Sequence, residues 1–322
     1  GISSLATLHP VKADDPQSVA ALAQEINAEL VIIGPEAPLV AGVADAIRAL
    51  GIPCFGPSKI AAQLEGSKSF AKEIMASAGV PTAQSMTCTT QSEIENALDT
   101  FGAPYVVKND GLAAGKGVVV TTDRAAAISH ALACGKVVIE EYLDGPEISL
   151  FGISDGKTVI GMEPAQDFKR AYDGDAGPNT GGMGAYSPLP WAPADIISRT
   201  EKEVLLPTIN AMAQRGTPFV GLLYAGLALT SRGIRVIEFN ARFGDPESEV
   251  LLPRLRTPLA QLLLAAATGN LADHPPLQWS DQGAVTIVLA SEGYPENPQV
   301  GRAATGAPES SDAIVFHAGT VF

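Results

Sequence analysis

The sequence lacks most of the features that distinguish secreted, membrane and metal-cluster proteins. It has only three cysteines, and neither a CxxC motif nor a Cys/His spacing typical of zinc sites connects them. These cysteines are Cys54, Cys88 and Cys134. The longest apolar stretch, residues 219–229, contains two glycines and is too short to cross a bilayer. The N-terminal sequence GISSLATLHP lacks the basic and apolar segments of a signal peptide. We therefore expect buried, reduced thiols in a cytoplasmic protein with no membrane partner.

Histidine and positive charge are also scarce. The four histidines, at positions 9, 130, 274 and 317, do not cluster with serine, cysteine or acidic residues in a pattern typical of a catalytic triad or a histidine metal site. The 21 lysines and arginines are outnumbered by 35 acidic residues, and the net charge is −14. This excess disfavours binding to nucleic acid or to an anionic membrane surface. An anionic substrate therefore requires a local cluster of cations.

The sequence does contain enough apolar residues for two or three domains. Its 322 residues are 46% hydrophobic and 17% charged, which excludes a largely disordered chain. An amphipathic helix is predicted from Asp14 to Ala28, with Asp15 as N-cap and Pro16 at the first helical position. A strand at 30–33, a helix at 39–50 and a strand at 52–55 follow, and this alternation predicts a doubly wound parallel sheet. Two further helices are predicted at 60–64 and 67–78.

Strands dominate the rest of the chain. The β-branched segments 105–108, 118–121 and 137–141 surround a glycine-rich loop and a helix at 124–133, which predicts a small α+β unit. Apolar segments separated by turn residues predict two antiparallel hairpins, 149–154 with 158–162 and 224–230 with 234–240. Between these hairpins, residues 163–190 are predicted to form a long loop, and loops of this length are usually functional.

The segment KNDGLAAGKG, residues 108–117, is a candidate phosphate-binding loop. It is not a Walker A loop, because Gly117 replaces the Ser/Thr and a strand follows instead of a helix. Its glycines still allow backbone N–H groups to approach phosphates, and Lys108 and Lys116 would add positive charge. The alternative interpretation is a mobile hairpin with exposed lysines.

The segment VIEEYLDGPE, residues 138–147, allows two interpretations. Glu140 and Glu141 are either solvated charges at the end of a strand or part of a hinge strand whose backbone pairs with an adenine base. In the second case, Glu147 accepts hydrogen bonds from ribose hydroxyls.

The segment VIEFNARFGDPE, residues 236–247, predicts a metal site. Period-two alternation divides its side chains between two faces: Glu238, Asn240 and Arg242 on one, and Ile237, Phe239 and Ala241 on the other. A carboxylate and an amide oxygen two residues apart suit Mg²⁺, and the arginine next to them suits a carboxylate or phosphate. The alternative is a sheet edge with a surface ion pair.

The predicted long loop contains two further candidate segments, QDFKR at 166–170 and GPNTGGMGAY at 177–186. Asp167 is suited to an ammonium group, and Lys169 and Arg170 are suited to an anion. Glycines in the second segment permit close approach to a ligand. A solvated, disordered loop is the alternative.

Six segments together resemble the phosphoribosylamine-glycine ligases, a family of ATP-grasp enzymes of purine biosynthesis. They are GPEAPLV (34–40), QLEGSK (63–68), KNDGLAAGKGV (108–118), IEEYLDGPE (139–147), PNTGGMGAYSP (178–188) and EFNARFGDPE (238–247). The resemblance implies that ATP, glycine and 5-phosphoribosylamine are converted to glycinamide ribonucleotide, ADP and phosphate through glycyl phosphate, with Mg²⁺ or Mn²⁺. It also implies a monomer that uses no covalent nucleophile of its own.

The resemblance also implies roles for individual residues. Lys68, Lys108 and the loop glycines Gly111, Gly115 and Gly117 would hold the ATP phosphates, Glu140, Glu141 and Leu143 the adenine, and Glu147 the ribose. Glu238 and Asn240 would bind the metal. Arg242, Asp167 and Lys116 are the candidate catalytic residues, and the candidate substrate contacts are Lys169, Arg170, Asn179, Thr180, Gly181 and Asp245.

The implied domains are an N-terminal α/β domain (1–85), a small ATP-grasp lid (86–144), a central ATP-grasp domain (145–260) and a partial C-terminal domain (261–322). The family's first strand and its GxGxREHA segment, which helps bind ribosyl phosphate, are absent, so we expect the N-terminal domain to lack that strand. Ala241 stands where Cys is common, which we expect to be neutral. Glu249 stands where Gln is usual, and we expect it to alter the charge near Arg242. The competing interpretations are another ATP-grasp ligase, such as one related to biotin carboxylase, and a nucleotide-binding module without turnover.

Overall fold

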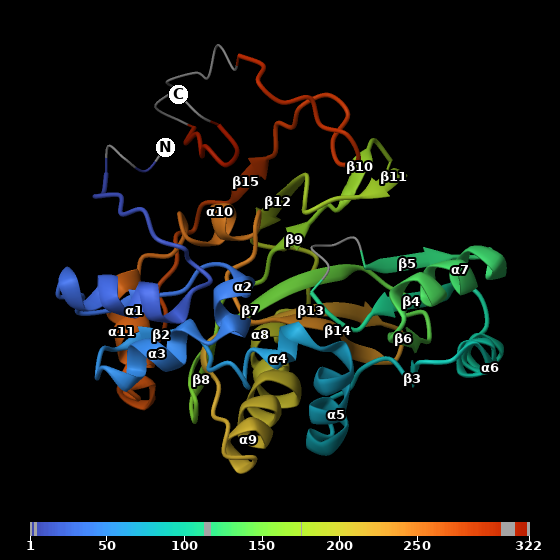
Figure 1. Cartoon of the computed structure of the whole chain (residues 1–322), viewed down its shortest axis with the longest axis horizontal. Coiled ribbons are helices and arrows are strands. Elements are labelled where there is room, and N and C mark those ends of the chain that lie inside the picture. The colour runs from blue at the N-terminus through green and yellow to red at the C-terminus, as the bar shows by residue number, and fades with distance from the viewer. Residues whose placement is uncertain (1, 3–4, 113–116, 175, 304–312, 321–322) are drawn as a thin grey trace.

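The computed structural model describes residues 2, 5–112, 117–174, 176–303 and 313–320, which form a mixed α/β molecule with several sheets (Figure 1). None of its helices in these ranges is long and apolar enough to cross a membrane. Small sheets lie to either side of a central one, with helices below it as Figure 1 is drawn.

The N-terminal region contains a parallel pair of strands covered by helices. Strands β1 (Val31–Ile32) and β2 (Cys54–Phe55) pair in parallel, and the helices are α1 (Pro16–Glu25), α2 (Glu36–Ala41) and α3 (Val43–Ala49). As predicted, Asp15 caps α1 by accepting a hydrogen bond from the backbone N–H of Gln17. The predicted helix at 39–50 is wrong in one respect. Gly42 has a φ of 97°, a left-handed conformation that separates α2 from α3.

Helices α4 (Gln63–Gly66) and α5 (Lys68–Ala78) lead to the small sheet. Ser67 caps α5 by accepting from the N–H of Phe70, and Gly79 ends the helix in a left-handed conformation. Helix α4 begins at residue 63 rather than 60, where turns precede it. Helix α5 packs against α9 (Leu206–Gln214) beneath the central sheet.

The small sheet is antiparallel, with the strand order β3-β6-β4-β5. Its strands are β3 (Ser85–Cys88), β4 (Tyr105–Asn109), β5 (Val118–Thr121) and β6 (Val137–Glu140). Helices α6 (Gln91–Phe101) and α7 (Arg124–Cys134) pack on it and enclose a separate apolar core that includes Ile94, Leu98 and Val107. The three strands and one helix predicted here are confirmed, whereas β3 and α6 were not predicted.

The central sheet is also antiparallel, with the order β14-β13-β7-β8, which confirms both predicted hairpins. Its strands are β7 (Glu147–Asp155), β8 (Val159–Gly161), β13 (Val220–Thr230) and β14 (Gly233–Asn240). Apolar side chains from one face join the core formed with α5 and α9. The opposite face packs against α10 (Ser248–Leu251) and α11 (Leu259–Ala267). Helix α8 (Ile196–Thr200) continues through a π-helical turn, Glu201–Leu205, into α9.

Residues 163–190 are not the unstructured loop predicted from the sequence. They contain four short strands, β9 (Gln166–Asp167), β10 (Arg170–Tyr172), β11 (Ala176–Asn179) and β12 (Gly184–Ser187). Strands β10 and β11 form a hairpin, and β12 lies between β9 and the distant β15 (Ala284–Ile287). Strands of two to four residues are too short to show an alternation of apolar and polar residues, so the sequence pattern did not indicate them. A short 3₁₀ turn, Leu271–Asp273, follows α11.

Candidate functional site

The end of β14 carries the two predicted metal ligands and contains a β-bulge. Glu238 lies opposite Gly226 and Val236 opposite Leu227, so Ile237 is an extra residue in the ladder. Val236 and Phe239 therefore both belong to the core beneath the sheet, and Ile237 does not. The prediction that Ile237 shares a face with Phe239 is wrong for this reason, whereas Phe239 and Ala241 are buried together as expected.

Glu238 lies amid four positive charges brought from different parts of the chain. Burial alone would raise the pKa of its carboxyl group, but Lys169, Lys108, Lys68 and Arg242 together lower the pKa below its ordinary value. Lys68 lies on α5 and Lys108 on β4, whereas Lys169 follows β9 and Arg242 follows β14. A chain with a net charge of −14 thus contains the local cation cluster that an anionic substrate requires.

The oxygens of Glu238 and Asn240 suit a hard cation. In the part of the chain that the structure describes, neither side chain has a hydrogen-bond or ion-pair partner. The same residues contain no group of three His, Cys, Asp or Glu side chains arranged to hold a metal. Mg²⁺ is commonly bound by one or two protein ligands, and substrate phosphates and water complete its shell. The pair therefore fits a nucleotide-bound Mg²⁺ better than a metal held by protein ligands alone.

Glu140 is buried and carries two ion pairs, which excludes the solvated-edge interpretation for this residue. Its Oε2 lies 2.9 Å from Lys108 Nζ and its Oε1 lies 3.0 Å from Lys72 Nζ. Lys108 Nζ also donates to the carbonyl oxygen of Ile237 at 2.9 Å. Lys108 is only 4% exposed and Glu140 only 3%. The bulge residue of β14 is thereby joined to β4 and β6 of the small sheet.

Glu141 pairs the two chain segments that connect the small sheet to the rest of the molecule. Its N–H donates to Gln84 O at 3.0 Å, and its Oε1 accepts from Gln84 N at 3.0 Å. Its Oε2 lies 3.0 Å from Arg232 Nη2. Burial acts to raise the pKa of Glu141, but the Gln84 amide and the Arg232 guanidinium lower the pKa below its usual value. Leu143, two residues further on, is half-buried.

Asp110 anchors the first part of the glycine-rich loop, and the sequence analysis missed it. Its carboxylate accepts from Ser69 N at 2.8 Å and from Ser69 Oγ at 2.6 Å, and it lies 2.6 Å from Lys136 Nζ. Burial opposes ionisation, but these partners lower the pKa of Asp110 to about 2. Lys68 Nζ donates to Gly111 O at 3.3 Å. The predicted sites Gly115 and Lys116 lie outside the described residues, whereas Gly117 is buried at the start of β5.

Asp167 at the end of β9, Lys169 just after it and Glu147 at the start of β7 lie close together. Lys169 Nζ is 3.7 Å from Glu147 Oε2 and 3.8 Å from Asp167 Oδ2. Burial raises the pKa of Asp167 to about 6, with a contribution from Glu247 and against the effect of Lys169. Burial would lower the pKa of Lys169, but Asp167, Glu238 and Glu147 raise it above its ordinary value. Asp167 is therefore a carboxyl group that titrates close to neutral pH.

Glu247 is a second carboxylate of this site that the sequence analysis did not identify. Its Oε1 accepts from Tyr224 Oη at 2.6 Å and from Ser149 Oγ at 2.9 Å, and it is 2% exposed. Burial and the charge of Glu247 raise the pKa of Tyr224 well above its usual value. Glu247 was not predicted because its hydroxyl partners lie on β7 and β13, far away in the sequence.

The segments PNTGGMG and RFGDPE are in direct contact. A Cβ atom added to Gly182 would lie 2.4 Å from Cδ of Pro246, and Gly182 has a φ of 133°. Thr180 fixes the first segment, because its N–H and its hydroxyl donate to Lys169 O at 2.7 and 2.9 Å, and its Oγ1 accepts from Gly182 N at 3.0 Å. Asp245, the residue before Pro246, is exposed beside this contact.

Arg242 joins the end of β14 to the N-terminal region. Its Nε lies 3.5 Å from Glu36 Oε2 and 3.6 Å from Glu65 Oε1. Glu65 Oε2 also accepts from Ala241 N at 2.8 Å. Burial raises the pKa of Glu65, and Arg242 opposes this shift. These contacts hold the guanidinium within the cation cluster.

Glu249 faces acidic neighbours rather than Arg242. Burial, Asp245 and Glu247 raise the pKa of Glu249, and Arg242 does not contribute, contrary to expectation. Its Oε2 is buried without a hydrogen-bond partner in the described part of the chain. Removing the charge of a carboxyl group in such surroundings is favourable, so protonation is easier here than in solution.

Three of the predicted substrate contacts lie in or next to the β10–β11 hairpin: Arg170, Asn179 and Gly181. Arg170 and Asn179 are opposite each other in this hairpin, and Arg170 Nη1 donates to Gly177 O at 2.7 Å. The N–H of Gly181 donates to Tyr294 Oη at 3.3 Å. Arg170 and Asn179 thus lie on the hairpin that adjoins Lys169 and Thr180 in the chain, and their role as substrate contacts stays a prediction.

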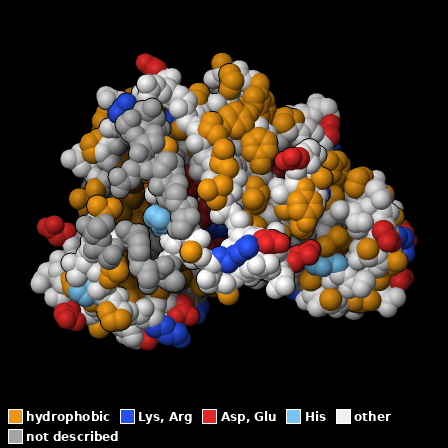
Figure 2. Space-filling model, turned by 90° about the horizontal axis from the view of Figure 1, so that it is seen from above, with side chains coloured by type: hydrophobic (Ala, Val, Ile, Leu, Met, Phe, Trp, Pro, Cys, Tyr) orange, Lys and Arg blue, Asp and Glu red, His pale blue; other side chains and the backbone are white. Residues whose placement is uncertain are grey.

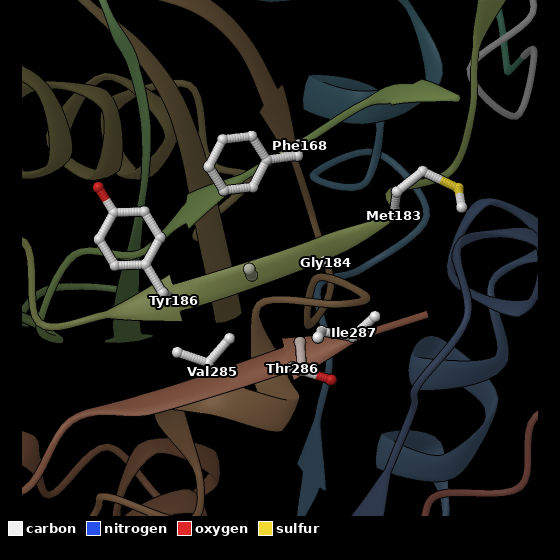
Figure 3. A pocket seen from close by; sticks show the side chains of 8 residues that line it. Phe168, Met183, Gly184, Tyr186, Val285, Thr286 and Ile287 are labelled. Atoms are coloured by element: carbon white, nitrogen blue, oxygen red, sulfur yellow. The ribbon is translucent and has the colours of Figure 1, made fainter. Parts of the chain in front are cut away.

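A pocket of 340 Å³ lies over the β12–β15 sheet and is distinct in character from this polar cluster. Its lining includes Phe168, Tyr186, Val285 and Ile287, which lie on the same side of the sheet (Figure 3). Figure 2 shows hydrophobic side chains gathered on this side of the molecule, where Val285 is 74% exposed. None of the described residues that line the pocket is charged, so this lining does not favour an anionic substrate.

The chain matches two domain models of one family. The ATP-grasp (A) domain of phosphoribosylglycinamide synthetase matches residues 66–248, and the N domain matches residues 1–65. The phosphoribosylamine-glycine ligase of Streptomyces coelicolor is 64% identical over 325 residues, covering 99% of this chain and 78% of that protein. The enzyme of the same name from Mycobacterium tuberculosis is 52% identical over 329 residues, covering 99% and 77%.

Solved structures show the same relationship. The crystal structure of phosphoribosylamine-glycine ligase from Thermotoga maritima has a TM-score of 0.79 at 31% identity, covering 92% of this chain and 74% of that one. A biotin carboxylase from Campylobacter jejuni has a TM-score of 0.69 at 17% identity, covering 88% and 64%. At that identity, the second likeness shows the fold alone.

Proposed function

The chain belongs to the phosphoribosylglycinamide synthetase family of ATP-grasp ligases, and from this membership we propose that it ligates glycine to 5-phosphoribosylamine. The reaction consumes ATP and gives glycinamide ribonucleotide, ADP and phosphate, a step of purine biosynthesis. The identity of 64% to a relative of that name, over 99% of this chain, supports the assignment. A monomeric state and a cytoplasmic location remain predictions.

The observation that carries the proposal is the convergence of Lys68, Lys108, Lys169 and Arg242 on Glu238. A ligase of this kind brings together a nucleotide triphosphate and a carboxylate, which repel each other. Positive side chains reduce this repulsion, and positioning and charge neutralisation are the main contributions that a protein makes to phosphoryl transfer. Lys68 and Lys108 lie nearest the glycine-rich loop, so we assign them to the phosphates.

We assign the adenine to the segment that leaves the small sheet. Glu140 ends β6, and Glu141 and Leu143 follow it. The glycine-rich loop lies between the neighbouring strands β4 and β5. Glu147, which is exposed at the start of β7, is assigned to the ribose. Glu140 is tied to two lysines, so its part is to hold Lys108 in place rather than to contact the base from a free side chain.

Glu238 and Asn240 are the residues that would hold Mg²⁺ or Mn²⁺. The metal would supply positive charge that offsets the negative charge of the nucleotide phosphates. The protein residues keep their oxygens free for this purpose, because no described residue bonds to either side chain.

We propose that glycine is activated as glycyl phosphate. A carboxylate oxygen of glycine attacks the γ-phosphorus of ATP, and the bond to the β-phosphate oxygen breaks to release ADP. The amine of phosphoribosylamine then attacks the carbonyl carbon, the C–O bond breaks, and phosphate leaves with the bridging oxygen. The attacking nitrogen must lose a proton, and Asp167, with a pKa of about 6, is the group best matched to accept it near neutral pH.

The substrate contacts assigned to Lys169, Thr180 and Asp245 rest on the contact between the two glycine-containing segments. Thr180 is bonded to Lys169 O, and Gly182 touches Pro246, so the two segments adjoin Lys169, one of the cations around Glu238. Arg242 is the cation of this surface that is best placed for a carboxylate or phosphate.

The decisive experiment measures ADP formation with Mg-ATP, glycine and 5-phosphoribosylamine, and then with each omitted in turn. Turnover should require all three, and bicarbonate should not replace glycine. Binding of Mg-ATP without substrate-dependent ADP formation would identify a nucleotide-binding module instead. Glycine labelled with ¹⁸O in its carboxyl group tests the intermediate, because one labelled oxygen should appear in the released phosphate. Unlabelled phosphate would exclude glycyl phosphate.

A further inference from the structure

Lys72 is a largely buried lysine near the proposed nucleotide site, and protein acceptors occupy all the donors of its ammonium group. An ammonium group has three N–H donors. Those of Lys72 have three protein acceptors: Glu140 Oε1 at 3.0 Å, Thr82 Oγ1 at 2.8 Å and Ala83 O at 3.1 Å. Its side chain is 11% exposed. Its effect on a ligand must therefore act through another residue.

Glu140 is the residue through which Lys72 acts on Lys108. The two lysines share this carboxylate, one on each oxygen, so the group of three carries two positive charges and one negative charge. Among the described residues, Lys108 Nζ has two acceptors, Glu140 Oε2 and Ile237 O, which leaves one N–H for another partner. In the absence of Lys72, the remaining pair of Lys108 and Glu140 would be neutral and would attract an anion only weakly.

Lys72 also touches both chain segments that connect the small sheet to the rest of the molecule. Thr82 and Ala83 belong to the segment that enters the sheet at β3, and Glu140 ends the strand from which the chain leaves it. Thr82 in turn donates to Val236 O at 2.7 Å on β14. Lys72 thus fixes Lys108 relative to β14, the strand that carries the metal ligands.

We propose that Lys72 is a positioning residue for the nucleotide, which shares Glu140 with Lys108 and so keeps one positive charge and one donor of Lys108 available to ATP. The proposal rests on the proposed function, because it takes the ligand of Lys108 to be ATP. It assigns Lys72 no contact with any substrate. It predicts a role in nucleotide affinity rather than in the chemical step.

The test compares three variants of Lys72 in steady-state kinetics with ATP varied and the other substrates saturating. Lys72→Met should raise the KM for ATP about tenfold, the effect of weakening one charge-assisted hydrogen bond, and leave kcat within about threefold. Lys72→Gln, which keeps donors but no charge, should raise KM similarly. Lys72→Arg, which keeps the charge, should restore KM to within about threefold of the original value. Mg-ADP binding by calorimetry should follow the same order.

The matched control is Glu73→Gln on the same helix. Glu73 forms an exposed ion pair with Arg215 at 2.7 Å and should leave the KM for ATP unchanged. Thermal unfolding checks that each variant is folded. If Lys72→Met does not fold, the KM of Lys72→Gln for ATP tests the proposal in its place.

Two outcomes overturn the proposal. Either the KM for ATP is unchanged in Lys72→Met and Lys72→Gln, or Lys72→Arg loses as much affinity as Lys72→Met. A Lys108→Met variant shows whether such a result contradicts the role of Lys72 alone or the nucleotide site as a whole. If Lys108→Met also leaves ATP affinity unchanged, the nucleotide site itself is wrongly assigned.

Discussion

Glu238 shows what a single residue in this site depends on. The sequence predicted its role from a carboxylate and an amide two residues apart on a strand. It did not predict that four cations converge on this carboxylate, because they come from separate elements whose arrangement is fixed only by the fold. The residue types were readable from the sequence, and their electrostatic environment was not.

Replacing Glu238 by Gln should lower kcat by about a hundredfold, because it removes one charge from the proposed metal site while keeping the shape of the side chain. The Mg²⁺ concentration needed for half-maximal rate should rise as well. Kinetics at varied Mg²⁺ measure both effects. Glu203→Gln, which removes an exposed carboxylate that pairs with Arg199, is the control and should behave like the original chain. Unchanged rates in Glu238→Gln would remove Glu238 from the metal site.

Asp110 should contribute to stability in a pH-dependent way. Its pKa is about 2 in the folded chain, below the usual value near 3.8, so its stabilisation is complete above pH 4 and is lost as the pH falls towards 2. Asp110→Asn should lower the free energy of unfolding by about 1–2 kcal/mol at pH 7. The difference between the two proteins should shrink between pH 4 and pH 2, as urea unfolding at several pH values would show.

The exposed pair between Asp99 and Arg124 provides the control for this measurement. Asp99 is also an aspartate with a cationic partner, at 2.7 Å, but its side chain is 68% exposed. Asp99→Asn should leave the unfolding curve unchanged at every pH. A pH-independent loss in Asp110→Asn would indicate that the hydrogen bonds to Ser69 matter and the charge does not.

At the scale of elements, the sequence predicted strands whose partners are local. The two hairpins of the central sheet and three strands of the small sheet have clear apolar patterns and turn residues, and they were found. Helix α6 was missed, although Thr90 and Glu93 form a capping box that the sequence shows. The strands β9 and β12 were missed because their sheet is completed by β15, about a hundred residues later.

The bulge in β14 explains a different kind of error. Simple alternation from Ile234 and Val236 would place Glu238 in the core, and one extra residue shifts the pattern. The period-two alternation of apolar and polar residues cannot locate such a bulge. Beyond the bulge the alternation holds, so Phe239 and Ala241 are in the core and Glu238 and Asn240 are not, as predicted.

The contact between the two glycine-containing segments gives a prediction at this scale. Gly182→Ala should reduce kcat/KM at least about tenfold, because its Cβ would lie 2.4 Å from Pro246 Cδ and would push the segments apart. Steady-state kinetics together with thermal unfolding measure the effect.

Gly174→Ala is the matched control for that change. Gly174 lies between β10 and β11 and also has a positive φ, 70°, but an added Cβ would have no neighbour within 4 Å. Both variants place a side chain at a positive φ, and the clash with Pro246 is present only in Gly182→Ala. Equal activity in both would show that the contact is not needed for function.

For the molecule as a whole, nucleotide binding should tighten the small sheet against the central one. Mg-ADP should raise the melting temperature and slow amide exchange in β4, β5 and the Gln84–Glu141 pair, because Lys108 and Glu140 link these parts to β14. Exchange in α1 should not change. Lys108→Ala should abolish both effects. Equal exchange with and without Mg-ADP would argue against closure of the small sheet on the nucleotide.

The paired segments at Gln84 and Glu141 have a consequence for how the molecule unfolds. The chain leaves the larger body and returns to it at hydrogen-bonded neighbours, so the small sheet is a topological insertion with its own apolar core. Insertions with adjacent ends leave the parent fold continuous. The larger body can therefore stay native while the insertion opens, and the two should melt as separate cooperative units.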